Sequence, residues 1–470
     1  MKGVFHAKLI LVVLAGLVLG AAALLQAQTL TSTLFRASDP GVRGGPAGAG
    51  GPIDGQPPLT GRQTDFFLAG KEEFEQADDV PEGLGPRMNL DSCGGCHAQP
   101  ATGGTSPFLN PQVKFASKDG GTDQVPFFIT ESGPVREARF KFNPDGTRDG
   151  GVHNTATITG RDGADGCKLA QPNFDAAARA NNLIFRIPTP LFGAGLIEQI
   201  PDSVIEANQA ANAASKQLLG IGGRPNRVVS GRAITGNTNN NGNDGTIARF
   251  GWKAQNQTLL LFSGEAYNVE MGITNELFQQ EREQDSNCQF ATVPNNVTDT
   301  AITTTPEGLS AIERFAFFQR FLAPPTPSTD TPGDATSIGR GRNLFERVGC
   351  ALCHTPTLRT GNSTVGALRD KDANLFSDLL LHNMGPGLAD NILQGQAQGD
   401  EFRTAPLWGL GKRIFFLHDG RTKDLIEAIQ EHKSAGNGEF RRSEANAVIN
   451  NFNGLSERQK QDVLNFLRSL

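Results

Sequence analysis

Four of the six cysteines form two short motifs that can hold a redox cofactor. The motifs are Cys-Gly-Gly-Cys-His, starting at Cys93, and Cys-Ala-Leu-Cys-His, starting at Cys350. In such a motif the two thiols add to the vinyl groups of a haem, and the adjacent histidine binds its iron. A zinc site would need more cysteine or histidine at short spacing. We therefore predict two covalently bound c-type haems, held by Cys93, Cys96, His97, Cys350, Cys353 and His354.

The sequence around the second motif predicts two helices that cross. Gly341 and Phe345 lie on a helical stretch that leads into Cys350, where the glycine allows close approach and the phenylalanine packs beside a porphyrin. Near the end of the chain, Ser456 and Gln459 form a capping-box pattern that begins a helix. Each signal alone fits an ordinary amphipathic helix, but in this order they resemble the terminal helices of class I cytochromes c.

The same order of features occurs in both halves of the chain. Each half has a Gly-x-x-x-Phe pair, a cysteine motif and a Pro-Leu-aromatic-Gly segment; these are Gly70, Phe74, Cys93 and Pro190–Gly195, then Gly341, Phe345, Cys350 and Pro406–Gly411. The halves look like a duplicated haem domain. The first domain carries an insertion at 100–180, rich in Gly, Asp and Asn, where we expect loops and short strands. A helix at 309–322 is expected to begin the second domain.

Length and composition limit the number of domains and the classes of partner. A chain of 470 residues is too long for one core, and a net charge of −6 without a basic run makes nucleic acid an improbable partner. The expected fold is mainly α, with two cytochrome c-like haem domains. Its expected parts are a signal peptide at 1–28, a Gly/Pro-rich linker at 29–66, a first haem domain at 67–305 and a second at 306–470.

The N-terminus has the form of an export signal. Two lysines precede an apolar run from Leu9 to Leu25, and small residues follow at the spacing that a signal peptidase cleaves. Cleavage is the favoured interpretation, and an uncleaved membrane anchor is the alternative. In either case the protein works outside the cytoplasm, and we expect it in the periplasm. The linker is expected to be a disordered leader or tether.

Further segments resemble the di-haem oxidoreductases once labelled thiol oxidoreductases, relatives of the bacterial di-haem cytochrome c peroxidases. The segments that carry the resemblance are Gly83–Pro86, Asn89, Thr189–Glu198, Phe250–Lys253, Met271–Thr274, Leu379–Pro386, Arg403–Trp408 and Phe416–Gly420. So many separated matches in one order are specific for the wider group. The family's substrate is less settled than its fold.

The resemblance implies a sixth ligand for the second haem. Leu425, Ile429 and His432 share one face of a helix that Thr422 can cap, where a histidine is ordinarily a core residue. In the peroxidase relatives the residue at this point binds the second iron and is methionine. His432 would thus make the second haem bis-histidine and lower its potential. Met384 is the alternative ligand.

Four other residues are expected near the haems. His382 and His418 either hydrogen-bond haem propionates and order the haem-edge loops, or cap loops. Trp252 and Trp408 lie either beside the haems, where they help electrons pass, or in the core, which is the favoured interpretation for Trp252. No role is assigned to Tyr267.

The first haem is expected to be the reactive one. Between the two motifs the single histidine is His153, so the first iron has an open sixth site or binds His153 reversibly. Glu198 follows the first Pro-Leu-aromatic-Gly segment, and the peroxidase relatives use a distal glutamate. We expect Glu198 to be the catalytic acid–base residue, with a surface position as the alternative. Cys167 and Cys288 are expected to form a disulfide, as in other exported proteins.

These features favour a peroxidase-like oxidoreductase in which electrons pass from the second haem to a substrate-binding first haem. Its partners would be a small redox protein or other electron donor and a small oxidant such as hydrogen peroxide. A calcium ion is a further candidate cofactor. The alternatives are a plain electron-transfer cytochrome and a haem-dependent oxygenase.

Overall fold

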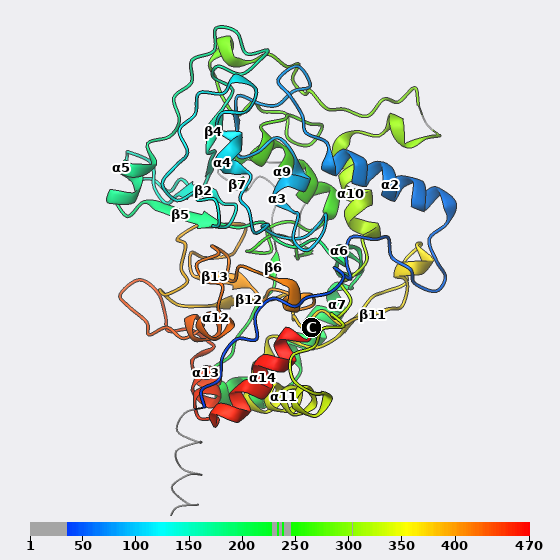
Figure 1. The fold of residues 1–470 in the computed structure, drawn as a ribbon, viewed down its shortest axis with the longest axis vertical. Helices are drawn as coiled ribbons and strands as arrows, with labels where there is room; N and C mark the ends of the chain where they lie inside the picture. The colour runs from blue at the N-terminus through cyan, green and yellow to red at the C-terminus, as the bar shows by residue number, and fades with distance from the viewer. Residues whose placement is uncertain (1–34, 228–232, 235–236, 239–245, 303) are drawn as a thin grey trace, which may run out of the picture.

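The computed structural model describes residues 35–227, 233–234, 237–238, 246–302 and 304–470, so the predicted signal peptide lies outside the described residues. Helices are the main regular structure, and the strands form small sheets (Figure 1). The helices are α2 (Gly61–Glu75), α3 (Cys93–Cys96), α4 (Gln112–Phe115), α5 (Phe174–Arg179), α6 (Ala194–Glu198), α7 (Asp202–Ala210), α8 (Ala213–Leu219), α9 (Leu259–Met271), α10 (Ala311–Phe321), α11 (Ala335–Val348), α12 (Leu425–Glu431), α13 (Asn446–Asn453) and α14 (Glu457–Arg468).

The strands pair antiparallel, and the largest sheet has the order β3-β2-β5. The strands are β1 (Arg87–Met88), β2 (Glu137–Phe140), β3 (Val152–His153), β4 (Ala156–Thr157), β5 (Leu183–Arg186), β6 (Asn226–Arg227), β7 (Ala233–Ile234), β8 (Asn237–Thr238), β9 (Ile247–Ala248), β10 (Leu358–Arg359), β11 (Asp372–Ala373), β12 (Leu381–Asn383) and β13 (Glu401–Arg403). Within the described residues, none of the helices combines the length and apolar character needed to cross a bilayer.

Helices α11 and α14 cross at a glycine, as the sequence predicts. A Cβ atom at Gly341 would lie 1.9 Å from the carbonyl oxygen of Asp462, so this approach requires glycine. Phe345 packs on Phe466 with ring centroids 5.4 Å apart. Helix α14 begins with the predicted capping box at Ser456. The predicted helix pair is confirmed.

Helices α2 and α10 repeat this arrangement beside the first cysteine motif. A Cβ atom at Gly70 would lie 2.2 Å from the carbonyl oxygen of Arg314, and Phe74 packs on Phe318 with centroids 4.9 Å apart. The sequence assigns this helix to the start of the second domain, which needs correction. Because α10 buries Phe315 and Phe318 against α2, it holds in the first half the place that α14 holds in the second.

The two Pro-Leu-aromatic-Gly segments also take equivalent places. A Cβ atom at Gly195 would lie 1.9 Å from the carbonyl oxygen of Arg320, close to the end of α10. A Cβ atom at Gly411 would lie 2.4 Å from that of Arg468, at the end of α14. Each segment therefore packs against the final turn of a helix in its own half, α10 in the first and α14 in the second, as expected of a duplicated domain.

A shared hydrophobic cluster joins the halves. Its buried side chains come from α6, α9 and α10 and from the loops around β11, and include Leu196, Ile197, Leu259, Ala316, Leu375, Leu379 and Trp408. Figure 1 shows α2, α9 and α10 in its upper part and α11, α13 and α14 in its lower part. The cluster lies between the two helix pairs, so it fixes one half against the other.

The 100–180 segment is largely loop with short helices and strands, as expected. Cys167, at one end of it, forms a disulfide with Cys288, which confirms the predicted pair. The two cysteines are 121 residues apart in sequence, and cross-links over long loops restrict the unfolded chain strongly. The bond ties the insertion to the loop between α9 and α10.

Residues 35–60, here called the strap, pack along the body of the protein. Asp39 forms an ion pair with Arg468 at 2.6 Å. Ile53 is buried, and its backbone N–H donates to the carbonyl oxygen of Phe321 at 2.7 Å. The predicted Gly/Pro-rich linker at 29–66 runs into α2, which begins at Gly61, and the prediction of a free tether needs correction, because these contacts fix the strap to α10 and α14.

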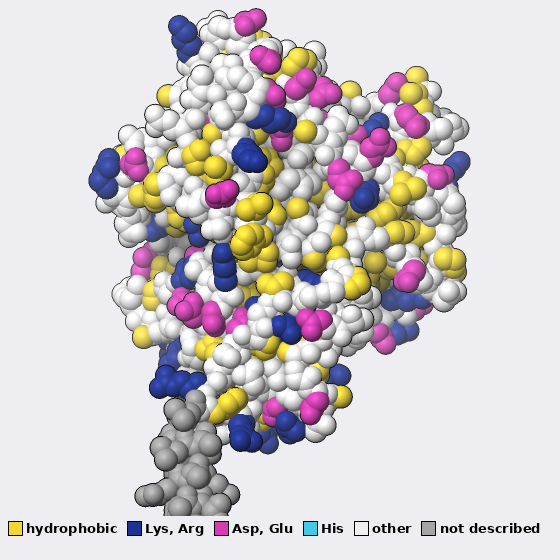
Figure 2. Space-filling view, viewed as in Figure 1, with side chains coloured by type: hydrophobic (Ala, Val, Ile, Leu, Met, Phe, Trp, Pro, Cys, Tyr) yellow, Lys and Arg dark blue, Asp and Glu magenta, His cyan; other side chains and the backbone are white. Residues whose placement is uncertain are grey.

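Charged side chains are mixed over the surface. Figure 2 shows Lys and Arg interspersed with Asp and Glu on the visible face, without a broad patch of either sign. Such a surface gives no electrostatic footprint for a phosphate backbone on this face.

Candidate cofactor sites

The first cysteine motif lies on the wall of a largely apolar cavity. Cys93 and Cys96 occupy the short helix α3, and His97 follows directly. The His97 Nδ1–H can donate to the carbonyl oxygen of Gly104, 2.9 Å away, and the ring also makes a hydrogen bond to the backbone of Thr189. Burial lowers the pKa of His97 to about 4, so the imidazole is neutral and able to bind iron.

The second motif lines another largely apolar cavity. The His354 Nδ1–H can donate to the carbonyl oxygen of Phe376, 3.1 Å away, and leaves Nε2 free. Burial lowers the pKa of His354 to about 4. Burial also raises the pKa of the Cys350 thiol to about 12, which keeps it uncharged.

Both cavities have the side chains that a c-type haem needs. Each has two cysteines and a neutral histidine on its wall, and the rest of each wall is largely apolar. Phe74 lies 5.8 Å from His97 and Phe345 lies 6.3 Å from His354, measured between ring centroids. These are the two phenylalanines that the sequence places beside the porphyrins.

His432 lines the second cavity together with His354. Its Nδ1–H can donate to the carbonyl oxygen of Ala428, 2.7 Å away, so its Nε2 is also free for a metal. Burial lowers the pKa of His432. Met384, the alternative ligand, lines the same cavity. The structure thus brings both candidate ligands to the cavity, and the histidine is already oriented by its backbone hydrogen bond.

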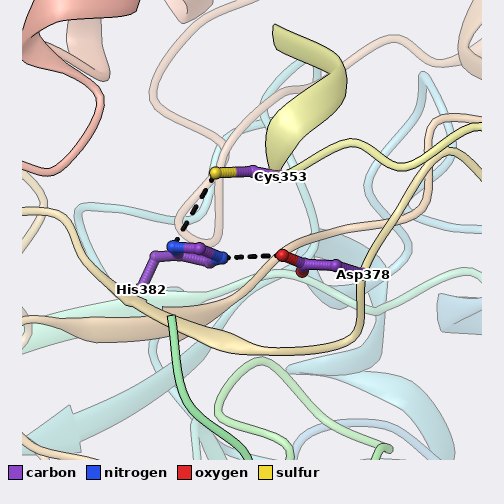
Figure 3. Close-up of side chains that lie close together, drawn as sticks. All are labelled: Cys353, Asp378 and His382. Atoms are coloured by element: carbon purple, nitrogen blue, oxygen red, sulfur yellow. Dashed lines mark hydrogen bonds and ion pairs between the residues drawn. The ribbon is translucent and has the colours of Figure 1, made fainter. Parts of the chain in front are cut away.

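His382 lies at the cysteine edge of the second cavity (Figure 3). Its Nε2 is 2.9 Å from Asp378, and its Nδ1 is 2.8 Å from Glu444 and 3.7 Å from the Cys353 sulfur. Among the described residues, one group of three Cys, His, Asp or Glu side chains is close enough to share a metal ion. Its members are Cys353, Asp378 and His382. In a haem protein the sulfur would be a thioether, so the group is better described as a network at the haem edge.

This group does not suit calcium, which prefers six to eight oxygen ligands. The one cluster of candidate metal ligands among the described residues is therefore not a calcium site.

His418 and Trp252 lie close together. His418 lines the second cavity, stacks on Phe402 with centroids 4.4 Å apart, and has its pKa lowered to about 4 by burial. Trp252 lines both cavities, and its indole N–H donates to the carbonyl oxygen of Ile187 at 2.8 Å. Trp252 is thus at the boundary between the two sites, whereas Trp408 packs in the shared cluster.

Three glutamates line the first cavity, Glu137, Glu265 and Glu270, of which Glu265 is buried and the other two are partly buried. Burial opposes ionisation of Glu137, but the guanidinium of Arg139, 2.6 Å away, holds its pKa well below the usual range. Burial and the charge of Glu137 raise the pKa of Glu270 well above the usual range. The two carboxyl groups are hydrogen-bonded, so they share one proton at neutral pH.

Glu265 is a third ionisable group in this cavity. Burial raises its pKa to about 7. The Asn256 side-chain amide donates to one of its oxygens, and within the described structure the other oxygen has no partner. A buried polar atom without a partner costs free energy, and a bound ligand or water relieves that cost.

The structure does not bring Glu198 to this cavity. Its carboxylate forms an ion pair with Arg320 at 2.7 Å and accepts the backbone N–H of Leu259 at 2.9 Å. The expectation that Glu198 is the acid–base residue needs correction, because Glu198 ends α6 and its carboxylate binds Arg320 and the first backbone N–H of α9. His153 is likewise not on the cavity wall: it pairs with Asp149 at 2.7 Å and stacks on Phe140.

Sequence reasoning missed the three glutamates, although two signals point to them. Glu137 and Arg139 are alternate residues of a strand, so both face the same side of the sheet. Glu265 and Glu270 interrupt the otherwise apolar helix α9, where charged residues are seldom buried without a purpose.

Comparisons with known proteins agree with a haem enzyme. The model of the family described as "Di-haem oxidoreductase, putative peroxidase" matches residues 176–470. A search of curated protein sequences gave no match.

Two solved structures share weak similarity with this chain. One is hydrazine synthase from Kuenenia stuttgartiensis, pressurised with xenon: 18% identity, 44% of this chain, 60% of that chain and a TM-score of 0.23. The other is a MauG-like protein associated with microbial copper homeostasis: 20% identity, 60% of this chain, 90% of that chain and a TM-score of 0.27. The chain thus spans about 60% of the hydrazine synthase chain.

Proposed function

The chain belongs to the di-haem oxidoreductase family, and on that premise we propose that it is an exported, periplasmic c-type cytochrome that reduces hydrogen peroxide. Cys93, Cys96 and His97 hold the reactive haem, and Cys350, Cys353 and His354 hold the electron-transfer haem. The two haems occupy two cytochrome c-like domains, the first ending after α10 and the second starting at α11. A small redox protein supplies the electrons.

The difference between the two cavities carries this proposal. Of the described residues, the second cavity has His354, His432 and two further histidines on its wall, whereas the first has His97 alone. Met271 also lines the first cavity, but its sulfur lies 3.9 Å from that of Cys93 and so packs at the attached edge. A singly ligated iron can accept an oxygen of peroxide, and a doubly ligated iron transfers electrons.

The first cavity also supplies the proton chemistry. Reduction of peroxide takes two electrons and two protons and gives two molecules of water. The anionic Glu137 would take the proton from one peroxide oxygen, and the proton held by Glu270 would go to the other, leaving oxygen. Arg139 keeps Glu137 anionic, so the pair offers both a base and an acid.

Trp252 lines both cavities, so its indole would lie between haems held in them and would conduct electrons from the second to the first. His382 and His418 hold the edge of the electron-transfer haem.

The test is the reaction of half-reduced, fully loaded protein with hydrogen peroxide. Rapid loss of peroxide, with two electrons taken from the reduced haem and its donor for each peroxide and with oxidation of the second haem followed optically, is the expected result. A protein that is inert to peroxide in every redox state would favour a plain electron carrier or an oxygenase, and oxygen consumption with an organic substrate would separate these two.

Replacing His432 tests the ligand of the second iron. His432→Met is expected to raise the potential of that haem, since axial ligands shift haem potentials within a range of about 0.8 V, and to add the weak long-wavelength band of methionine ligation. Spectroelectrochemistry measures both. Met384→Leu is the matched control and should leave the ferric spectrum unchanged. A changed ferric spectrum in Met384→Leu, with an unchanged spectrum and potential in His432→Met, would assign Met384 as the ligand.

A further inference from the structure

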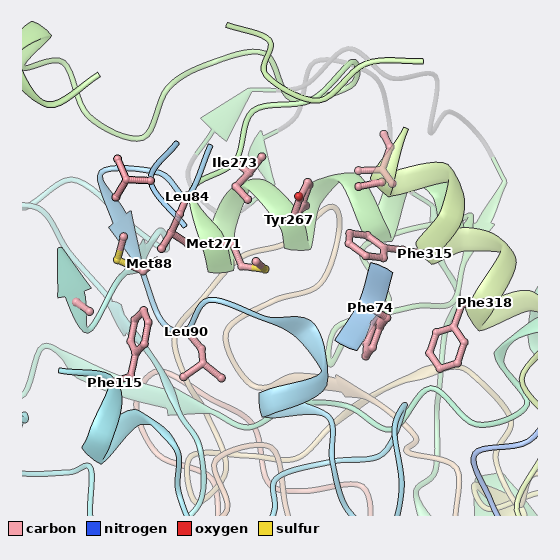
Figure 4. Packing of buried hydrophobic residues seen from close by; sticks show 14 of the residues in the cluster. Phe74, Leu84, Met88, Leu90, Phe115, Tyr267, Met271, Ile273, Phe315 and Phe318 are labelled. Atoms are coloured by element: carbon pink, nitrogen blue, oxygen red, sulfur yellow. The ribbon is translucent and has the colours of Figure 1, made fainter. Parts of the chain in front are cut away.

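The single tyrosine of the chain lies at the first cavity. Tyr267 is on α9, and its ring meets the ring of Phe315 edge to face with centroids 5.1 Å apart. Figure 4 shows Tyr267 and Met271 on α9 above Leu90, beside Phe315 and Phe74. The side chain is buried with 4% of its surface exposed. The phenol is therefore held in a fixed position at the cavity that the first cysteine motif lines.

The hydroxyl group of Tyr267 has one carboxylate as its partner. It donates to Oδ2 of Asp78 at 3.1 Å, and Asp78 is 8% exposed. The backbone N–H of Asp78 donates to the carbonyl oxygen of Asp91, two residues before Cys93. After burial, the charge of Asp78 is the largest influence that raises the pKa of the Cys93 thiol. The pair thus lies at the edge where the first haem is attached.

We propose that Tyr267 is a redox-active residue that gives one electron to the oxidised first haem while its phenolic proton passes to Asp78. The inference rests on the proposed function, because peroxide is the oxidant that creates the electron demand. The O–H bond of Tyr267 breaks and an O–H bond forms on Asp78. The products are a neutral tyrosyl radical, a protonated carboxyl group and a haem reduced by one electron.

The proton acceptor distinguishes Tyr267 from Trp252, another oxidisable side chain at this cavity. Loss of an electron makes a phenol or an indole strongly acidic, so oxidation is easiest where a base takes the proton. Trp252 donates its N–H to the carbonyl oxygen of Ile187, which is a very weak base. Tyr267 instead faces a carboxylate. The geometry favours Tyr267 as the residue that stores the oxidising equivalent and Trp252 as the residue that conducts.

Burial supports both roles in the pair. It raises the pKa of Asp78 to about 7, so this carboxylate is a stronger base than an exposed one and is still substantially ionised near neutral pH. Burial and the nearby charge of Asp78 raise the pKa of Tyr267 well above its usual value, so the phenol keeps its proton until it is oxidised.

The experiment is freeze-quench electron paramagnetic resonance of the loaded protein after mixing with peroxide. A radical signal is expected, and its hyperfine splitting should collapse when the protein is grown with ring-deuterated tyrosine. Because the chain has one tyrosine, the label reports Tyr267 alone. Ring-deuterated tryptophan is the matched control and should leave the signal unchanged. Tyr267→Phe should abolish the signal, and Asp78→Asn should lower its yield at least tenfold.

A second oxidant separates this inference from the proposed function. A ruthenium photo-oxidant can oxidise the loaded protein without peroxide, with the same readout. Haem oxidation by peroxide without a tyrosine signal would overturn the inference and leave the proposed function standing. A tyrosine signal with the photo-oxidant, in a protein inert to peroxide, would support the inference and overturn the peroxidase assignment. No tyrosine signal with either oxidant overturns the inference. Labelled wild-type protein gives the answer even if a variant does not fold.

Discussion

Protein in which Cys93 and Cys96 are both changed to Ala is expected to keep one covalently bound haem where the wild type keeps two. Only cysteine sulfur can form the thioether bonds, and each motif lines its own cavity. The haem at Cys350 and Cys353 should therefore remain. The measurement is haem per chain, determined after acid–acetone extraction, which removes haem that is not covalently attached.

The disulfide offers a matched control. Cys167→Ala with Cys288→Ala also removes two sulfurs from the first half, but these sulfurs are bonded to each other. This variant should keep both haems, while its free energy of unfolding falls by about 2–5 kcal/mol. Two haems in the Cys93/Cys96 variant, or a lost haem in the control, would contradict the assignment.

Removing the shared proton of the first cavity should slow peroxide reduction strongly. Glu137→Gln and Glu270→Gln each keep the size of the side chain but end proton exchange within the pair. A general acid–base group contributes roughly 10²–10⁴-fold to a rate, so turnover should fall at least 100-fold, about 2.7 kcal/mol of transition-state stabilisation. Both haems and their spectra should stay, because neither residue is expected to bind iron.

Glu198→Gln is the decisive comparison for this prediction. Glu198 is also partly buried and paired with an arginine, but it lies at Arg320 rather than on the cavity wall. Steady-state peroxide turnover should remain within a few-fold of wild type in this variant. Loss of turnover in Glu198→Gln, with normal turnover in the other two variants, would return the catalytic role to Glu198.

The sequence predicts best those features that depend on local spacing. The cysteine motifs, the capping box at Ser456 and the glycine of α11 each need only a few neighbouring residues, and the structure places them as expected. The partner of Cys167 also follows, because only one other cysteine is left for it.

Features that depend on distant contacts are harder to predict. Helix α10 is amphipathic whichever half it joins, and only its contact with Gly70 shows that it belongs to the first. Glu137 and Glu270 are far apart in sequence and meet only after β2 and α9 fold together. The sequence assigns Glu198 a catalytic role from its place in a recognised segment. That segment does not reveal that Arg320, far along the chain, pairs with its carboxylate.

The strap sets an order of events as the chain is made. Asp39 accepts hydrogen bonds from the backbone N–H of Leu425 and from the guanidinium of Arg468, which are synthesised long after it. The part of the strap around Asp39 can therefore dock only after α14 is in place, although Ile53 can dock as soon as α10 has formed. Until then the chain around Asp39 is open to proteases, so resistance to cleavage near Asp39 marks the moment at which α14 has packed.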